Sequence, residues 1–205
     1  MPTAPQPPSA NNRASSSGAP AKESTSSPSD GPFLTDIKEL RRRARQHIEN
    51  GAVTEAYRGD RTVVLDLLNQ ALATELVCVL RYKRHFFMAT GINAEAVAAE
   101  FNQHAIEEQG HADQLAARIT QLGGEPDFDP QGLAMRSHAE YVPGTTLLDM
   151  IKEDLIAERI AIDSYAEMAR YIGDKDMTTR RMLEGILAVE EEHADDMKSL
   201  LEKFS

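Results

Sequence analysis

Two copies of a Glu-x-x-His motif occur in the chain, at Glu108–His111 and at Glu190–His193. On a helix, residues three positions apart lie on one face, about one turn apart, so the carboxylate and the imidazole of each motif can converge on one point. Mixed carboxylate and imidazole ligands suit iron or manganese, whereas structural zinc sites favour Cys and His. Each motif therefore predicts half of a metal site.

A glutamate in an apolar segment precedes each motif by almost the same distance. Glu75 lies 33 residues before Glu108, and Glu158 lies 32 residues before Glu190. Four ionised carboxylates facing the interior of a protein would be very costly without compensation. Two divalent cations would balance their four negative charges. The repeat therefore predicts a carboxylate-bridged site for two metal ions, with the ligands Glu75, Glu108, His111, Glu158, Glu190 and His193.

A tyrosine follows each of the two single glutamates by seven residues. Tyr82 follows Glu75, and Tyr165 follows Glu158. Residues seven apart share a helix face, two turns from each other. One interpretation is that each tyrosine supports a carboxylate by a hydrogen bond. The other is a redox role, which makes Tyr82 the candidate catalytic residue.

Other polar side chains near the motifs have less specific patterns. Asp154 lies one turn before Glu158, which predicts a supporting role, and His104 lies one turn before Glu108. His104 is interpreted as a partly exposed residue or a transient metal site. Three glutamates are expected to be solvated, namely Glu107, Glu191 and Glu192. Three histidines have no partner that the sequence reveals, namely His47, His85 and His138.

Four long helices are predicted to position these groups, over residues 61–90, 94–122, 146–172 and 175–203. Each segment has apolar residues at three- and four-residue spacing, and three of them end at glycine. A helix of ~28 residues is ~42 Å long, and four helices of matched length predict an all-α four-helix bundle. The first and last pairs have short connections, so we expect antiparallel hairpins. Residues 125–145 form one long crossover between them.

The segments before the bundle differ from it in composition. Residues 1–32 are rich in Pro, Ser and Ala and are predicted to be a disordered tail. Residues 33–60 are predicted to be a helical extension, with Thr35 as the N-cap of a helix through Asn50 and Gly51 as its stop. The five residues Lys38, Arg41, Arg42, Arg43 and Arg45 make this helix basic. It is either a phosphate- or partner-binding patch or a solvated helix paired with acidic neighbours. Residues 61–205 form the bundle.

The overall composition limits the partners of the chain. Its formal net charge is −11, which argues against sequence-independent binding of nucleic acid. It contains no run of about 18 apolar residues, so we expect no membrane span. Cys78 is its one cysteine and cannot form an internal disulfide. With no apolar signal-peptide core at the N-terminus, a cytoplasmic location is expected.

The segments that carry these residues resemble the bacterioferritin and ferritin-like family from about Val63 to Glu202. They are LNQALATEL with Glu75, EEQGHADQLAARITQLGGEP with Glu108 and His111, DLIAERIAI with Glu158, and EEEHADDM with Glu190 and His193. The resemblance implies that Glu75 and Glu158 are terminal ligands, that Glu108 and Glu190 bridge both metals, and that His111 and His193 bind one metal each. It also implies that Tyr82 is the family's tyrosine near the site.

Two departures from bacterioferritin change the expectation. Gln109 stands where that family carries a haem-ligating Met, so no haem is expected. Only twelve residues follow His193, which leaves no room for the fifth helix of a 24-subunit shell. The chain is more similar to the Dps-like ferritins, which form homo-oligomeric cages of twelve subunits. Those proteins often have a pair of thiols near the site, which Cys78 alone cannot supply.

The resemblance implies a ferroxidase with two iron ions per subunit, for which manganese is an alternative metal. It would oxidise Fe(II) to Fe(III) with O2 or H2O2, for iron storage or detoxification in a cage. A rubrerythrin-like di-iron or di-manganese peroxidase or catalase is an alternative, although the chain lacks a Cys-x-x-Cys module. A Dps-like protein that protects DNA and a di-iron oxygenase acting on an organic substrate are further alternatives.

Overall fold

The computed structural model describes residues 36–92 and 94–204. Their four long helices are α2 (Arg61–Met88), α3 (Ala94–Gln121), α5 (Leu147–Ile172) and α6 (Met177–Phe204). Three short elements are α1 (Ile37–Arg43), the 3-10 helix η1 (Ile48–Asn50) and α4 (Leu133–Arg136). The described residues contain no strand, so the all-α prediction is confirmed. The predicted tail over residues 1–32 lies outside the described residues.

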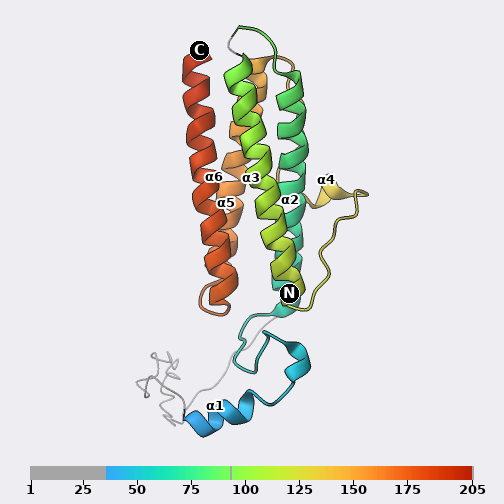
Figure 1. Cartoon of the computed structure of the whole chain (residues 1–205), viewed down its shortest axis with the longest axis vertical. Coiled ribbons are helices and arrows are strands. Elements are labelled where there is room, and N and C mark those ends of the chain that lie inside the picture. Colours follow the sequence, from blue (N-terminus) through green and yellow to red (C-terminus); the bar gives the residue numbers. More distant parts are fainter. Residues whose placement is uncertain (1–35, 93, 205) are drawn as a thin grey trace, which may run out of the picture.

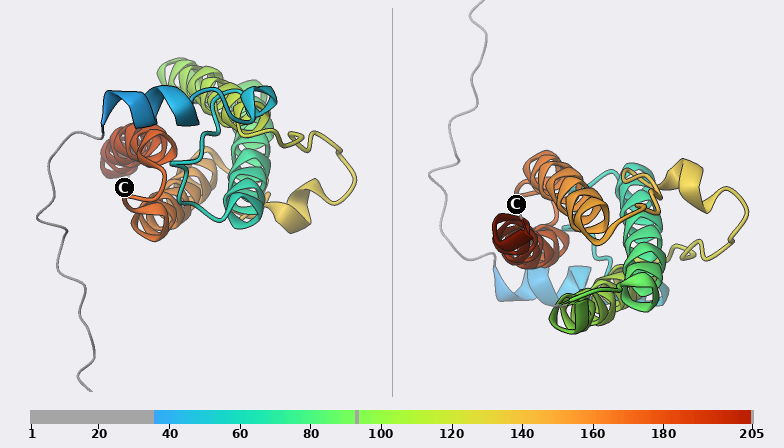
Figure 2. Two further views of the ribbon diagram at one scale, coloured as in Figure 1. Left: turned by 90° about the horizontal axis from the view of Figure 1, so that it is seen from below. Right: turned by 90° about the horizontal axis from the view of Figure 1, so that it is seen from above.

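The long helices form two antiparallel hairpins packed side by side, α2 with α3 and α5 with α6 (Figures 1 and 2). Their ends lie within two residues of the predicted ones. The two larger of three apolar clusters fill the bundle. One is centred on residues such as Leu68, Leu115 and Leu183, and the other on Phe101 and Ile151. The polar residues of the predicted metal site lie between these two clusters.

The start of α5 is fixed by a capping box. The Thr146 hydroxyl accepts a hydrogen bond from the backbone N–H of Asp149 at 3.1 Å, and the Asp149 carboxylate accepts one from the N–H of Thr146 at 3.2 Å. Such caps satisfy N–H groups that have no partner inside the helix. The capping box therefore defines where the crossover ends and α5 begins.

We expect Thr146→Ala to lower the free energy of unfolding by about 1 kcal/mol, because the variant loses this cap. Thr178→Ala is the matched control, since Thr178 is exposed in the first turn of α6. The measurement is urea unfolding of the metal-free proteins. Equal midpoints for the two variants would show that the cap contributes nothing.

The predicted helix from Thr35 to Asn50 is wrong. Thr35 lies outside the described residues, α1 is capped by the carboxylate of Asp36 and ends at Arg43, and η1 follows separately. His47 between them has a positive φ of 50°, which no α-helix accommodates. α1 buries none of its residues. Without a packed face, a short helix lacks the tertiary contacts that sustain longer ones.

The crossover from α3 to α5 runs along the outside of α2 (Figure 1). Five side chains of α2 hold it by bonds to its backbone, and one of them is Arg84, which donates to the carbonyl of Pro143. Asn69 contacts Glu125 and Asp127, Thr74 accepts from the N–H of His138 at 2.9 Å, Arg81 donates to the carbonyl of Glu140 at 3.3 Å, and Nε2 of His85 lies 3.1 Å from the carbonyl of Pro143. These bonds explain why a long irregular connection is ordered. They also give His85 and His138 partners that the sequence did not reveal.

Among the described helices, α2 alone is long and apolar enough to cross a membrane by length and composition. Half of its most apolar window is buried inside the bundle. A core helix of a water-exposed bundle passes the same test, and α2 also buries Glu75, Arg81 and His85. Its hydropathy is explained by its place in the core.

Candidate metal centre

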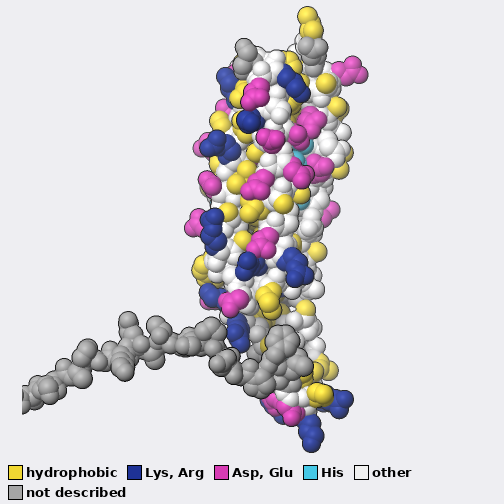
Figure 3. Space-filling model, turned by 90° about the vertical axis from the view of Figure 1, so that its left-hand side faces the viewer, with side chains coloured by type: hydrophobic (Ala, Val, Ile, Leu, Met, Phe, Trp, Pro, Cys, Tyr) yellow, Lys and Arg dark blue, Asp and Glu magenta, His cyan; other side chains and the backbone are white. Residues whose placement is uncertain are grey.

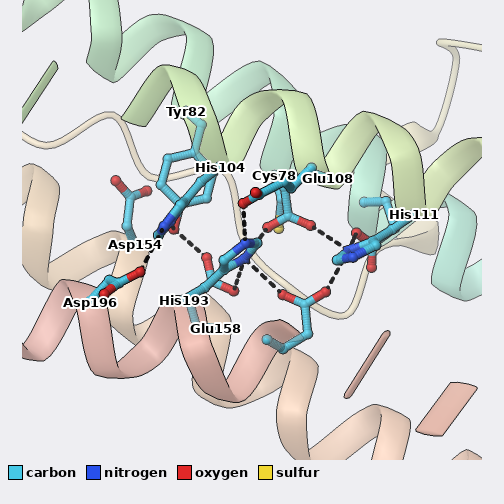
Figure 4. A network of polar contacts seen from close by, with 12 residues as sticks. Cys78, Tyr82, His104, Glu108, His111, Asp154, Glu158, His193 and Asp196 are labelled. Atoms are coloured by element: carbon cyan, nitrogen blue, oxygen red, sulfur yellow. Dashed lines mark hydrogen bonds and ion pairs between the residues drawn. The ribbon is translucent and has the colours of Figure 1, made fainter. Parts of the chain in front are cut away.

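All six predicted ligands meet near the middle of the four long helices, one or two from each helix. Figure 4 labels four of them, Glu108, His111, Glu158 and His193. Each of the six is buried, with at most 4% of its surface exposed. Glu75 comes from α2, Glu158 from α5, and the two Glu-x-x-His motifs from α3 and α6. The three-residue spacing places each motif on one inward face, as predicted. The residues therefore form one cluster built from both hairpins.

The cluster contains two groups of four ligands. In the first, Nδ1 of His111 lies 3.4 Å from Oε2 of Glu75, 3.4 Å from Oε2 of Glu108 and 2.9 Å from Oε1 of Glu190. In the second, Nδ1 of His193 lies 3.4 Å from Oε2 of Glu190, 3.7 Å from Oε1 of Glu108 and 3.9 Å from Oε2 of Glu158. Each group has the donor atoms and the spacing to hold one ion.

Glu108 and Glu190 belong to both groups. Each directs one carboxylate oxygen towards His111 and the other towards His193. This is the orientation of a carboxylate that bridges two ions. Glu75 and Glu158 each belong to one group only. The geometry thus supports the same division into bridging and terminal ligands that the resemblance implies.

Seven polar atoms of the cluster are buried without a hydrogen-bond partner in the described part of the chain. They are Oε2 of Glu75, Oε1 of Glu108, Oε2 of Glu158, both carboxylate oxygens of Glu190, and Nδ1 of His111 and of His193. Buried polar atoms are nearly always satisfied in folded proteins. Oxygen and imidazole donors that converge without well-aligned hydrogen bonds between them are suited to divalent cations. The residues therefore fit two metal ions.

The cluster binds protons strongly when it holds no metal. Burial, together with the charges of Glu108 and Glu190, raises the pKa of Glu75 and of Glu158 well above the usual range. Burial alone would lower the pKa of His111, but its carboxylate contacts raise it to about 12. The same balance raises the pKa of His193 to about 11. Protons thus take the place of part of the positive charge that metal ions would supply.

Two tyrosines link the hairpins across the centre. The Tyr82 hydroxyl on α2 donates to Oε1 of Glu158 on α5, and the Tyr165 hydroxyl on α5 donates to Oε1 of Glu75 on α2. Both rings are buried. Burial and the adjacent carboxylate raise the pKa of each hydroxyl well above its usual value, so both remain protonated donors. Each tyrosine therefore orients a buried glutamate of the opposite hairpin.

Two residues beside the centre depart from the sequence interpretation. His104 is 1% exposed rather than partly exposed, its Nδ1 lies 3.1 Å from the Tyr82 hydroxyl, and its ring stacks on His193 with centroids 4.0 Å apart. Glu107 is not simply solvated, because its Oε2 lies 2.9 Å from Nε2 of His193. A carboxylate there fixes the orientation of a metal-binding imidazole.

Asp154 supports the fold of the neighbouring helix rather than a ligand. Its carboxylate accepts from Nε of Arg81 at 2.8 Å and lies 2.8 Å from Nδ1 of His85, and all three side chains are fully buried. Arg81 also donates to Sγ of Cys78 at 3.5 Å. The sequence interpretation missed Arg81. The signal that would have indicated it is an arginine within the most apolar of the four helices.

Comparison with known proteins agrees with this architecture. Residues 65–205 match the family model described as a ferritin-like domain. The chain belongs to the ferritin-like family. This ferritin-like chain is 28% identical to a bacterioferritin of Rhodobacter capsulatus over 145 residues, 69% of this chain and 84% of that relative. It is 32% identical to a "DNA protection during starvation protein" of Pyrococcus furiosus over 141 residues, 67% of this chain and 76% of that relative.

Among solved structures, the ferritin-like chain resembles a dodecameric thioferritin, the bacterioferritin-related protein of Bacteroides fragilis. The TM-score is 0.69 at 32% identity, and the match covers 72% of this chain and 89% of that one. A bacterioferritin of Desulfovibrio desulfuricans, described with a di-iron site in different catalytic states, gives a TM-score of 0.62 at 25% identity, covering 69% and 80%.

Proposed function

We propose that this ferritin-like protein is a ferroxidase, which oxidises Fe(II) to Fe(III) at the centre with O2 or H2O2 as the electron acceptor. One observation carries the proposal: two four-ligand groups share Glu108 and Glu190, so two substrate ions would lie next to each other. The matched bacterioferritins support it. The direct test is aerobic Fe(II) oxidation by the purified protein, with the rate compared to that of iron in buffer alone.

Each residue has a distinct part in this proposal. Glu108 and Glu190 hold both iron ions, Glu75 and His111 complete one position, and Glu158 and His193 complete the other. Two iron ions bind per subunit, and manganese suits the same ligands. The hydroxyls of Tyr82 and Tyr165 keep the terminal carboxylates in place. A redox role for Tyr82 stays a prediction.

Metal binding is expected to release protons and to tighten as pH rises between about 6 and 8. The metal-free centre holds protons on His111 and His193, whose pKa values are about 12 and 11, and raises the pKa of Glu75 and Glu158. Cations must displace these protons, and because each displaced proton is a product of binding, a lower proton concentration favours the metal-bound state. Calorimetric titration with Co(II) in two buffers of different ionisation enthalpy measures the release. Binding that is independent of pH and buffer would contradict it.

We propose a cytoplasmic cage of twelve subunits that stores or detoxifies the oxidised iron. The dodecameric description of the similar Bacteroides fragilis structure supports this number over twenty-four. The proposed site needs no haem, and Gln109, in place of a haem-ligating Met, is exposed and donates to Asp113. The mass of the metal-loaded assembly in solution separates a dodecamer from a larger shell.

Two alternatives remain distinct from this proposal. A di-iron or di-manganese peroxidase or catalase would use the same ligands, and an assay of peroxide turnover separates it from a ferroxidase. DNA protection is suggested by the Pyrococcus furiosus relative's description. The basic residues of α1 give it little support, because Arg42 and Arg43 both pair with Glu39 and the chain carries a net charge of −11.

A further inference from the structure

A second group of metal-ligand side chains lies beside the dinuclear centre. It consists of Glu100 and His104 on α3 and Asp196 on α6. Nε2 of His104 lies 3.5 Å from Oε1 of Glu100 and 3.6 Å from Oδ2 of Asp196. Figure 4 shows His104 between Asp196 on one side and His193 on the other. None of the three residues belongs to either of the two four-ligand groups.

The hydrogen bonds around His104 leave Nε2 free for a cation. The Tyr82 hydroxyl donates its proton to Glu158, so its oxygen accepts from Nδ1–H of His104. In a neutral imidazole the other nitrogen then carries a lone pair. Here that lone pair faces two carboxylates, and like partial charges directed at one another are unfavourable. A cation between them converts this repulsion into attraction.

The distances in the group match those around one metal ion. Bonds of ~2.0–2.2 Å from a metal to nitrogen and oxygen, at a tetrahedral angle, separate the two donor atoms by about 3.4 Å. The observed separations of 3.5 and 3.6 Å are close to this value and longer than a good N–H···O hydrogen bond. The donor atoms are therefore spaced for an ion rather than for direct bonding.

We propose that Glu100, His104 and Asp196 bind a third divalent cation, and that this site delivers cations to the dinuclear centre. The delivery role rests on the ferroxidase proposed above. The side chains of Asp196, Glu100 and His104 are 55%, 39% and 1% exposed, so the site leads from solvent to the interior. A cation in this site would be close to the dinuclear centre, because His104 stacks on His193. His104 also forms a further possible ligand group with His193 and Glu107.

The surface outside this site favours the approach of cations. A surface hollow on α6 is lined by Ala188, Glu191, Glu192, Asp195 and Asp196. Figure 3 shows histidine surface surrounded by acidic side chains on the upper half of this face. Surfaces of one charge sign raise the local concentration of oppositely charged ions. An arriving cation thus meets negative charge before it meets a ligand.

The test compares the variant E100Q/D196N with the control variant E95Q/E202Q. Both remove two charges from the same two helices, but Glu95 and Glu202 are exposed and lie outside the ligand group and the acidic hollow. The oxygen-free proteins are titrated with Co(II), and the bound metal per chain is counted. We expect three Co(II) per chain in the wild type and the control, and two in E100Q/D196N. Filling of the dinuclear centre, followed by stopped-flow absorbance, should be at least ~10-fold slower in E100Q/D196N.

The outcomes separate this proposal from the ferroxidase. Two Co(II) per chain in the wild type, or three in E100Q/D196N, would overturn the third site and leave the dinuclear centre intact. Three Co(II) in the wild type with equal filling rates in all three proteins would overturn the delivery role. A wild-type protein that binds three Co(II) but does not accelerate Fe(II) oxidation would overturn the ferroxidase and leave the third cation site standing.

Discussion

We expect the Glu108→Ala variant to oxidise Fe(II) at least ~100-fold more slowly than the wild-type protein. Residues that merely support metal ligands change affinity or activity by ~10–100-fold when they are replaced. Glu108 belongs to both ligand groups, so its loss removes one donor from each metal position at once. The measurement is the initial rate of Fe(III) absorbance at saturating dioxygen.

Glu95→Ala is the control for this variant, because Glu95 is an exposed glutamate on the same helix and lies outside the ligand groups and the acidic hollow. It should oxidise Fe(II) at the wild-type rate. Loss of folding does not explain an inactive Glu108→Ala protein if its far-ultraviolet circular dichroism and assembly mass match those of the wild type. Wild-type oxidation by a folded Glu108→Ala protein would refute the assignment of the centre.

The second large effect concerns stability. Asp154→Ala should lower the free energy of unfolding by ~3–5 kcal/mol, because it leaves the guanidinium of Arg81 buried without a counter-charge. Arg81 and Asp154 are both fully buried and joined at 2.8 Å. His85, which also contacts Asp154, loses a partner as well. Denaturant unfolding of the metal-free protein measures the loss.

Two further variants show whether the charge pair causes this loss. Asp163→Ala removes an exposed aspartate from the same helix and should change stability by less than about 0.5 kcal/mol. The double variant Arg81→Met/Asp154→Leu should recover much of the loss, because replacing both charges by apolar groups leaves neither uncompensated. If Asp154→Ala matched Asp163→Ala, the buried pair would not contribute to stability.

The sequence predicted the four long helices well because their signals are local. Apolar spacing and the glycine stops each act within a few residues. The six candidate ligands were predictable for a similar reason. The three-residue spacing places the Glu and the His of each motif on one helix face. The repeat then relates the first hairpin to the second without knowledge of how the hairpins pack.

Features that depend on packing could not be predicted in this way. His104 was expected to be partly exposed, and only the placement of His193 and Tyr82 against it shows that it is buried. The partners of Asp154 lie more than sixty residues away in the sequence. α1 ends early because none of its residues is buried against the rest of the protein. The amino-acid composition of α1 does not show whether the helix packs.

The internal repeat also shows where the two halves of the molecule differ. By alignment of the two motifs, His104 and Glu100 of α3 correspond to Ile186 and Met182 of α6, and Asp196 corresponds to Gln114. Ile186 is buried in the apolar cluster at the opposite end of the centre. The proposed third cation site therefore has no counterpart at the repeat-related positions of the described chain. Cations that enter through it would reach the ligand group of His193 before that of His111.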